Sequence, residues 1–142
     1  MARIVTLLII YLVSQFMNAQ MVSREKDSIV GVTIKVTVPN VTSNDGEVLF
    51  ALYNSNENFI NRNPIKRKKA SISEGRASVI FKNVSAGEYA IMCLHDKNMN
   101  GKIDFNEVGI PIEDYGSTNN VFRMGPPLFE DAKFMIENKS LD

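Results

Sequence analysis

The chain has 142 residues, with 16 basic and 16 acidic side chains and a hydrophobic fraction of 44%. Its formal net charge of zero excludes the strong positive field that nucleic acids and anionic membranes attract, so we expect no nucleic-acid partner. The single cysteine, Cys93, excludes an intramolecular disulfide, and its apolar surroundings indicate a buried small side chain.

Residues 1–19 have the pattern of a secretory signal peptide. Arg3 provides the positive start, residues 4–13 form an apolar run, and Ala19 is the predicted last residue before cleavage. Because the apolar run is too short to span a bilayer, a retained N-terminal anchor is only the alternative. The pattern predicts a periplasmic or secreted protein with no transmembrane span in the mature chain.

Removal of residues 1–19 leaves 123 residues with 15 basic and 16 acidic side chains. Residues 20–28 are polar and predict a flexible leader. Residues 29–138 are of ordinary size for a single domain with its own core.

The first half of this domain predicts strands. Apolar residues alternate with small or polar ones over residues 30–38, which is the period of a half-buried strand. Residues 47–53 are apolar on both faces and predict a more central strand. Residues 54–63 form an Asn-rich loop, in which Phe59 and Ile60 are the expected anchors.

A basic run, Lys66-Arg67-Lys68-Lys69, follows. It predicts a solvated loop or an edge strand protected by lysines, and a phosphate-binding patch is the alternative. Residues 77–81 alternate as a strand. Residues 88–95 predict a buried strand, although Ser85 and Glu88 could also form the capping box of a helix. Residues 128–137 predict a final strand.

Several short strands with turn residues between them indicate an all-β domain. We expect an antiparallel β-sandwich of about seven strands, immunoglobulin-like or transthyretin-like.

Residues 96–107, which read D-K-N-M-N-G-K-I-D-F-N-E, match the ligand spacing of a calcium loop. Calcium requires six to eight oxygen ligands, and alternate residues of a short loop can supply them. The glycine at the sixth position, Gly101, permits the sharp turn. The predicted ligands are Asp96, Asn98, Asn100, Lys102 through its backbone carbonyl, Asp104 and Glu107.

Three carboxylates predict weak binding, in the range of about 10⁻⁴–10⁻³ M that is typical of extracellular modules. Gly109 and Pro111 prevent a regular exiting helix, so the loop is not expected to be part of an EF-hand. The alternative is an Asn/Gly-rich turn that needs no ion.

The calcium loop begins a segment with little periodicity, residues 96–127. Loops of this length are uncommon unless they are functional or disordered, and this one contains many apolar residues. We expect an ion to order it and the loop to present a surface to a partner. The expected contacts, with loop packing as the alternative role, are Tyr115, Ser117, Asn119 and Asn120.

No sequence motif indicates catalysis. His95 and Asp96 are neighbours, but side chains of adjacent strand residues point to opposite faces. Glu113 and Asp114 could be the paired carboxylates of a glycosidase, although an adjacent pair is more often solvated charge. A non-catalytic protein is therefore expected, with a small hydrolase of envelope glycan or ester as the alternative.

Three stretches together carry a family resemblance. They are Gly87-Glu88-Tyr89-Ala90 leading to His95-Asp96-x-Asn98-x-Asn100-Gly101-Lys102-Ile103-Asp104, then Gly109-Ile110-Pro111-x-Glu113-x-Tyr115-Gly116-Ser117-x-Asn119-Asn120, and finally Gly125-Pro126-Pro127-x-Phe129-Glu130-Asp131-Ala132-x-Phe134. Their order resembles the bacterial domain-of-unknown-function family 2141, over roughly residues 30–137. The resemblance implies a secreted or periplasmic β-sandwich without an established activity.

Taken together, these patterns predict a calcium-binding, non-catalytic module of the cell envelope. Its partner would be an envelope protein or a glycan, and the sequence leaves the oligomeric state open. The same sandwich without a metal is the remaining alternative.

Overall fold

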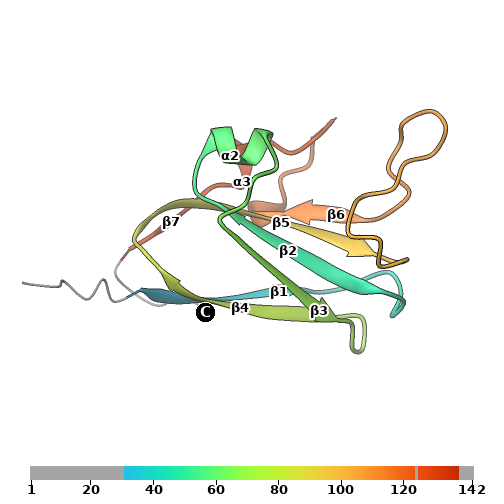
Figure 1. Ribbon diagram of the computed structural model, residues 1–142, viewed down its shortest axis with the longest axis horizontal. Helices are drawn as coiled ribbons and strands as arrows, with labels where there is room; N and C mark the ends of the chain where they lie inside the picture. Colours follow the sequence, from blue (N-terminus) through green and yellow to red (C-terminus); the bar gives the residue numbers. More distant parts are fainter. Residues whose placement is uncertain (1–30, 124, 138–142) are drawn as a thin grey trace, which may run out of the picture.

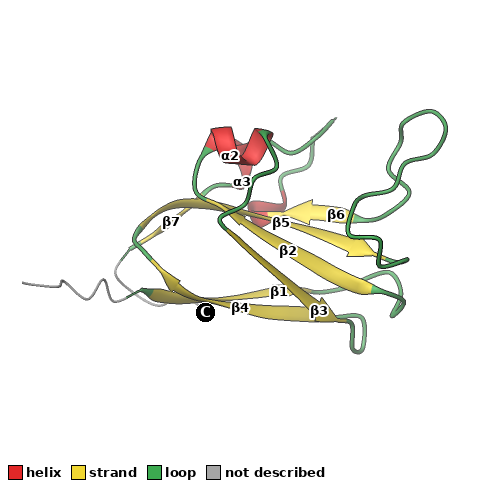
Figure 2. Ribbon diagram, viewed as in Figure 1, coloured by secondary structure: helices red, strands yellow, loops and turns green. Residues whose placement is uncertain are grey.

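The computed structural model describes residues 31–123 and 125–137, which form a three-layered domain (Figure 1). A two-stranded sheet makes the lower layer, a five-stranded sheet makes the middle layer, and two short helices lie above it (Figure 2). The predicted signal peptide, residues 1–19, and leader, residues 20–28, lie outside the described residues.

All strand pairings are antiparallel. The two-stranded sheet has the order β1-β4, and the larger sheet has the order β3-β2-β5-β6, with β7 also paired to β5. The strands are β1 (Val32–Val38), β2 (Glu47–Tyr53), β3 (Lys66–Ser71), β4 (Ala77–Val84), β5 (Gly87–Asp96), β6 (Tyr115–Ser117) and β7 (Phe134–Ile136). The expected antiparallel all-β sandwich of about seven strands is confirmed, and the immunoglobulin-like or transthyretin-like subtype stays a prediction.

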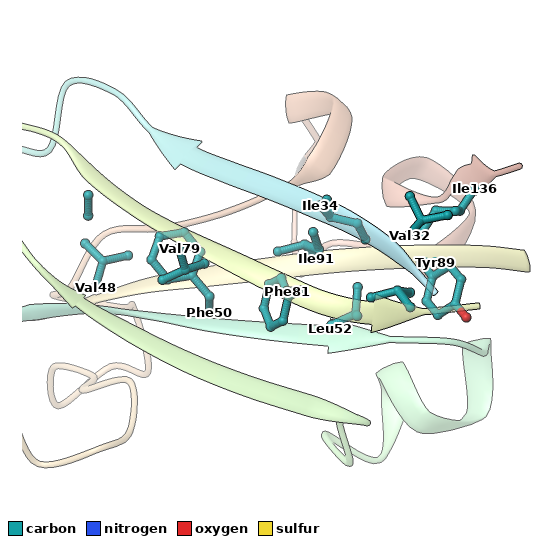
Figure 3. Close-up of a cluster of buried hydrophobic side chains, with 12 residues drawn as sticks. Val32, Ile34, Val48, Phe50, Leu52, Val79, Phe81, Tyr89, Ile91 and Ile136 are labelled. Carbon is teal, nitrogen blue, oxygen red and sulfur yellow. The ribbon is translucent and has the colours of Figure 1, made fainter. Parts of the chain in front are cut away.

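The core lies between the two sheets, as Figure 3 shows. Alternation along β1 and β4 directs Val32, Ile34, Val79 and Phe81 inward, where they meet Phe50 and other residues of the larger sheet. Phe50 and Phe81 are 1% and 0% exposed, so their burial contributes about 1.5–3 kcal/mol each. The central position predicted for β2 is confirmed, because β2 lies between β3 and β5.

The basic run forms β3, which is an edge strand of the larger sheet, as predicted. The ammonium group of Lys66 donates to the backbone carbonyls of Lys82 and Asn83 at the end of β4. This contact ties the edge of the larger sheet to the smaller sheet.

Helix α2 (Asn56–Ile60) lies in the segment that we expected to be a loop. The Ser55 hydroxyl caps it by accepting from the backbone N–H of Asn58. Phe59 is buried against Tyr53 and Phe129, as expected of an anchor. Ile60 is 67% exposed, so its predicted anchoring role is wrong. The helical turn of about 100° per residue rotates it away from the sheet.

The last predicted strand, residues 128–137, is only partly a strand. Its first half forms helix α3 (Phe129–Ala132), and β7 follows. Phe129 and Ala132 are three residues apart on α3, so both face the sheet and pack with Tyr53, Phe59 and Ala90.

Strand β5, and not the alternative helix, leads into the predicted calcium loop. The segment 96–127 contains more regular structure than its sequence suggests. It includes a hairpin with the bridge between Phe105 and Pro111, strand β6, and the 3-10 helix η1 (Thr118–Asn120). In the described part of the chain, no helix is both long and apolar enough to cross a membrane.

Candidate functional site

The predicted calcium loop begins at Asp96, the last residue of β5, whose side chain is fully buried. Its Oδ1 atom accepts from the backbone N–H of Asn100 at 3.0 Å, and Oδ2 accepts from that of Gly101 at 2.7 Å. Gly101 has a φ of 79°, the left-handed conformation for which glycine was expected at this position. Asp96 therefore closes the turn at the base of the loop.

Asp104 follows Asp96 later in the loop, and its carboxylate accepts hydrogen bonds from two amide side chains. The Asn98 Nδ2 donates to Asp104 Oδ2 at 2.6 Å. The Asn100 Nδ2 donates to both Asp104 oxygens, at 3.0 and 2.9 Å. One connected network thus contains four of the predicted ligand side chains: Asp96, Asn98, Asn100 and Asp104.

Of the other two predicted ligands, Lys102 joins this network only through its backbone, and Glu107 lies outside it. The Lys102 side chain is exposed, and only its backbone was expected to take part; its N–H donates to Asn100 Oδ1 at 3.0 Å. Glu107 is exposed in the turn of the 104–112 hairpin. Asn106 organises that turn, because its Oδ1 accepts from the backbone N–H groups of Val108 and Ile110.

Within residues 31–123 and 125–137, no three His, Cys, Asp or Glu side chains are grouped as a metal site would require. Asp96, Asp104 and Glu107 are accordingly not assembled as three carboxylates around one point. The metal ligand set remains a prediction.

Glu113 is the residue of this region that the sequence did not reveal. Its side chain is buried, with 5% exposed, so the expectation of solvated charge is wrong for this residue. Oε1 accepts from the backbone N–H of Lys97 at 2.9 Å, and Oε2 accepts from that of Asp104 at 3.1 Å. Glu113 thus ties the start of the loop, at Lys97, to its later part, at Asp104. Its spacing from Lys97 follows no local period, which is why no sequence pattern indicated this role.

His95 is buried on the opposite face of β5 from Asp96, as the alternation of the strand predicts. Its Nε2 lies 2.8 Å from the backbone carbonyl of Asp45, and a carbonyl only accepts, so Nε2 carries the proton. The remaining nitrogen, Nδ1, lies 3.5 Å from Thr42 Oγ1 and 3.8 Å from Asp114 Oδ2. His95 therefore connects the loop before β2 with the segment before β6.

Asp114 belongs to this second cluster. The Thr42 hydroxyl donates to its Oδ2, and the Lys97 ammonium lies 3.4 Å from the same atom. The Thr42 hydrogen bond is the largest cause that lowers the pKa of Asp114, and the charges of Lys97 and His95 lower it further. Glu113 and Asp114 thus point to different partners and do not form a pair.

Two polar residues after β6 have structural contacts. The Thr118 hydroxyl accepts from the backbone N–H of Ile91 at 3.0 Å and donates to the carbonyl of Ala132. The Asn119 amide donates to the carbonyls of Asp131 and Lys133. For Asn119, the loop-packing alternative is therefore the observed one. Cys93 is half-buried, and burial raises the pKa of its thiol, as expected of a packing residue and not a nucleophile.

These features define a class of small antiparallel β-sandwich proteins in which a hydrogen-bonded Asp/Asn loop extends from the end of one central strand. The chain belongs to a bacterial family described as "Uncharacterized protein conserved in bacteria (DUF2141)", whose model matches residues 36–142. The family inferred from the sequence is thereby confirmed. Comparisons with curated proteins and with solved structures found no match.

Proposed function

We propose that this protein is a non-catalytic module of the bacterial cell envelope whose loop of residues 96–107 binds calcium. One observation carries the proposal: the side chains of Asn98 and Asn100 converge on Asp104, next to the buried carboxylate of Asp96. The loop thereby brings together carboxylate and carboxamide groups, whose oxygens are the ligands that calcium prefers.

The donor chemistry is compatible with an ion. Each carboxylate oxygen of Asp96 accepts one backbone N–H, whereas a carboxylate offers about four lone-pair positions in all. Asn98 and Asn100 direct their amide nitrogens toward Asp104, while each of their amide oxygens accepts one backbone N–H, from Asn100 and Lys102 respectively. An amide oxygen has two lone pairs, so each retains one acceptor position for an ion.

Glu113 extends this donor set beyond the residues that the spacing indicated. Its carboxylate already lies at the backbone of Asp104, so it is a candidate to replace the exposed Glu107 as the third acidic group of the loop. Comparison of variants at the two positions separates these assignments.

The envelope location rests on the signal-peptide pattern of residues 1–19 and on membership of a bacterial family. The absence of catalysis rests on how the candidate groups are used. His95 is buried and bound to the Asp45 carbonyl, and the Glu113 carboxylate is buried against the backbone of Lys97 and Asp104, so neither side chain is presented to a substrate at the surface.

The decisive experiment compares thermal melts of the purified protein in millimolar calcium and in excess chelator. If the dissociation constant is about 10⁻⁴ M, a tenfold excess of calcium stabilises the fold by about 1.4 kcal/mol. The melting temperature should then rise by roughly 4–8 °C. Asp104→Asn should abolish the rise, and isothermal titration should detect direct binding.

Glu57→Gln is the matched control, since Glu57 is an exposed carboxylate on α2 outside the loop. It should retain the full calcium effect. Loss of the effect in Glu113→Gln but not in Glu107→Gln would assign the third ligand to Glu113. Coincident melts of the wild-type protein in calcium and chelator would reject calcium binding and leave a metal-free sandwich.

A further inference from the structure

The outer face of the five-stranded sheet is apolar at the end that the helices leave uncovered. Leu49 on β2, Leu94 on β5 and Tyr115 on β6 are direct cross-strand neighbours, so their side chains share this face. Leu49 and Leu94 are partly buried, and Tyr115 is 42% exposed. We refer to Leu49, Leu94 and Tyr115 as the open face.

The outer face of the two-stranded sheet is mostly polar. There β1 presents Lys35 and Thr37, and β4 presents Ser78, Lys82 and one apolar residue, Ile80, which is 47% exposed. A polar face with a single exposed apolar residue is ordinary for a sandwich, whereas an apolar row across three strands is typical of a surface that binds a partner.

The open face has a cationic border on one side. Lys69 and Arg67 of β3 are opposite Leu49 and Ala51, so both side chains lie on this same face of the sheet. The Lys69 side chain is 69% exposed, and its ammonium lies 3.1 Å from a Glu47 oxygen. A partner for the open face should therefore combine apolar side chains with negative charge.

The chain itself contains such a segment. The 104–112 hairpin exposes Phe105, Val108 and Ile110, which are 48%, 78% and 59% exposed. The exposed Glu107 lies in the same turn. In Figure 1 this hairpin rises on the side of the large sheet that carries α2 and α3, which is the side of the open face.

We propose that two copies of this chain pair through their open faces, each placing its 104–112 hairpin against the β3 edge of the other. A two-fold axis parallel to the strands brings the β6 edge of one copy over the β3 edge of the second copy. This arrangement sets Glu107 against Lys69 and Arg67 twice, in one isologous contact. The open face extends across three strands, and a second protein surface can cover such a row more completely than a small molecule can.

The test is done in excess chelator, so that the calcium binding proposed above does not contribute to the result. Analytical ultracentrifugation of the purified protein, from micromolar to near-millimolar concentration, should show the mass rising from one chain toward two. Val108→Asp should weaken association by about tenfold or more, because it places a charge in the apolar contact. Circular dichroism melts of each variant confirm that the fold is intact.

A charge exchange tests the orientation. Lys69→Glu and Glu107→Lys should each weaken the dimer, and the variant that carries both should regain most of the lost affinity. Lys35→Glu makes the same charge change on the polar face of the other sheet and should have no effect. A single-chain mass at every concentration would overturn the proposal. A dimer that Val108→Asp and Glu107→Lys leave unchanged would also overturn it. The same holds if Lys35→Glu weakens the dimer as much as Lys69→Glu does, or if the variant with both charge changes does not regain affinity.

Discussion

Gly46 lies directly against the backbone of Asp96, so the turn before β2 forms the floor of the candidate site. A Cβ atom at Gly46 would overlap the Asp96 carbonyl oxygen and would come 2.7 Å from the Lys97 Cα. Glu47 pairs with Asp96 in the sheet, and this pairing brings the turn and the loop together. The close approach means that the position of Asp96 depends on a residue fifty positions earlier in the chain.

Gly46→Ala should therefore be strongly destabilising. Gly46 has a φ of 70°, and an alanine there would meet backbone atoms, which cannot move aside as a side chain can. We expect a loss of about 3 kcal/mol or more in urea unfolding, since steric overlap adds to the backbone cost of about 1–2 kcal/mol. Gly109→Ala is the matched control, because Gly109 has a φ of 79° with no atom within 4 Å of the added Cβ. Equal losses for the two variants would show that the contact with Asp96 has no energetic role.

Glu113→Gln should destabilise the protein by about 1–3 kcal/mol, because the amide can accept from only one of the two backbone N–H groups that Glu113 now binds. The amide nitrogen would then face the other N–H, of Lys97 or Asp104. Glu107→Gln, at an exposed position of the same loop, should change stability by less than about 0.5 kcal/mol. Urea unfolding in chelator measures both, and a Glu113→Gln protein as stable as the wild type would contradict the bridging role.

The Asp114 carboxylate should make stability depend on acid pH. Its pKa in the folded protein is lowered from the ordinary value of 3.8, first by the Thr42 hydrogen bond and then by Lys97 and His95. A lowered pKa means that the contribution is present above pH 3.8 and is lost as the pH falls through the folded-state value. The difference in unfolding free energy between wild type and Asp114→Asn should shrink accordingly on acidification.

Thr42→Val provides the companion test, because it removes the largest cause of the lowered pKa. Its stability relative to wild type should converge on acidification over the same pH range as that of Asp114→Asn. A constant offset at every pH would assign the effect of either variant to packing alone.

Thr118→Val should loosen the connection between β5 and α3. The valine has the shape of threonine but leaves the backbone N–H of Ile91 without its partner and cannot donate to Ala132. The expected loss is about 1–3 kcal/mol. Thr118→Ser retains the hydroxyl and should lose less, and hydrogen exchange at the Ile91 amide should accelerate only in the valine variant. Similar exchange in both variants would argue against the hydrogen bond as the cause.

Local periodicity in the sequence was sufficient to identify most strands. Apolar alternation located β1 and β4, the fully apolar run identified the central β2, and four basic residues marked β3 as an edge. The spacing of Asp96, Asn98, Asn100 and Asp104 likewise indicated a local turn, whether as the predicted calcium loop or as its metal-free alternative. These features are local, because they depend on residues within about ten positions of one another.

Features that depend on contacts between segments distant in the sequence were decided only by the tertiary structure. Glu113 is buried because β6 pairs with β5 and carries the preceding residues under the loop. His95 reaches Asp45, and Thr42 reaches Asp114, across 50 and 72 positions of sequence. Helices α2 and α3 form where the outer face of the large sheet offers Tyr53 and Ala90 as packing partners. Burial and hydrogen bonding at these positions follow from strand order and register, which no local period specifies.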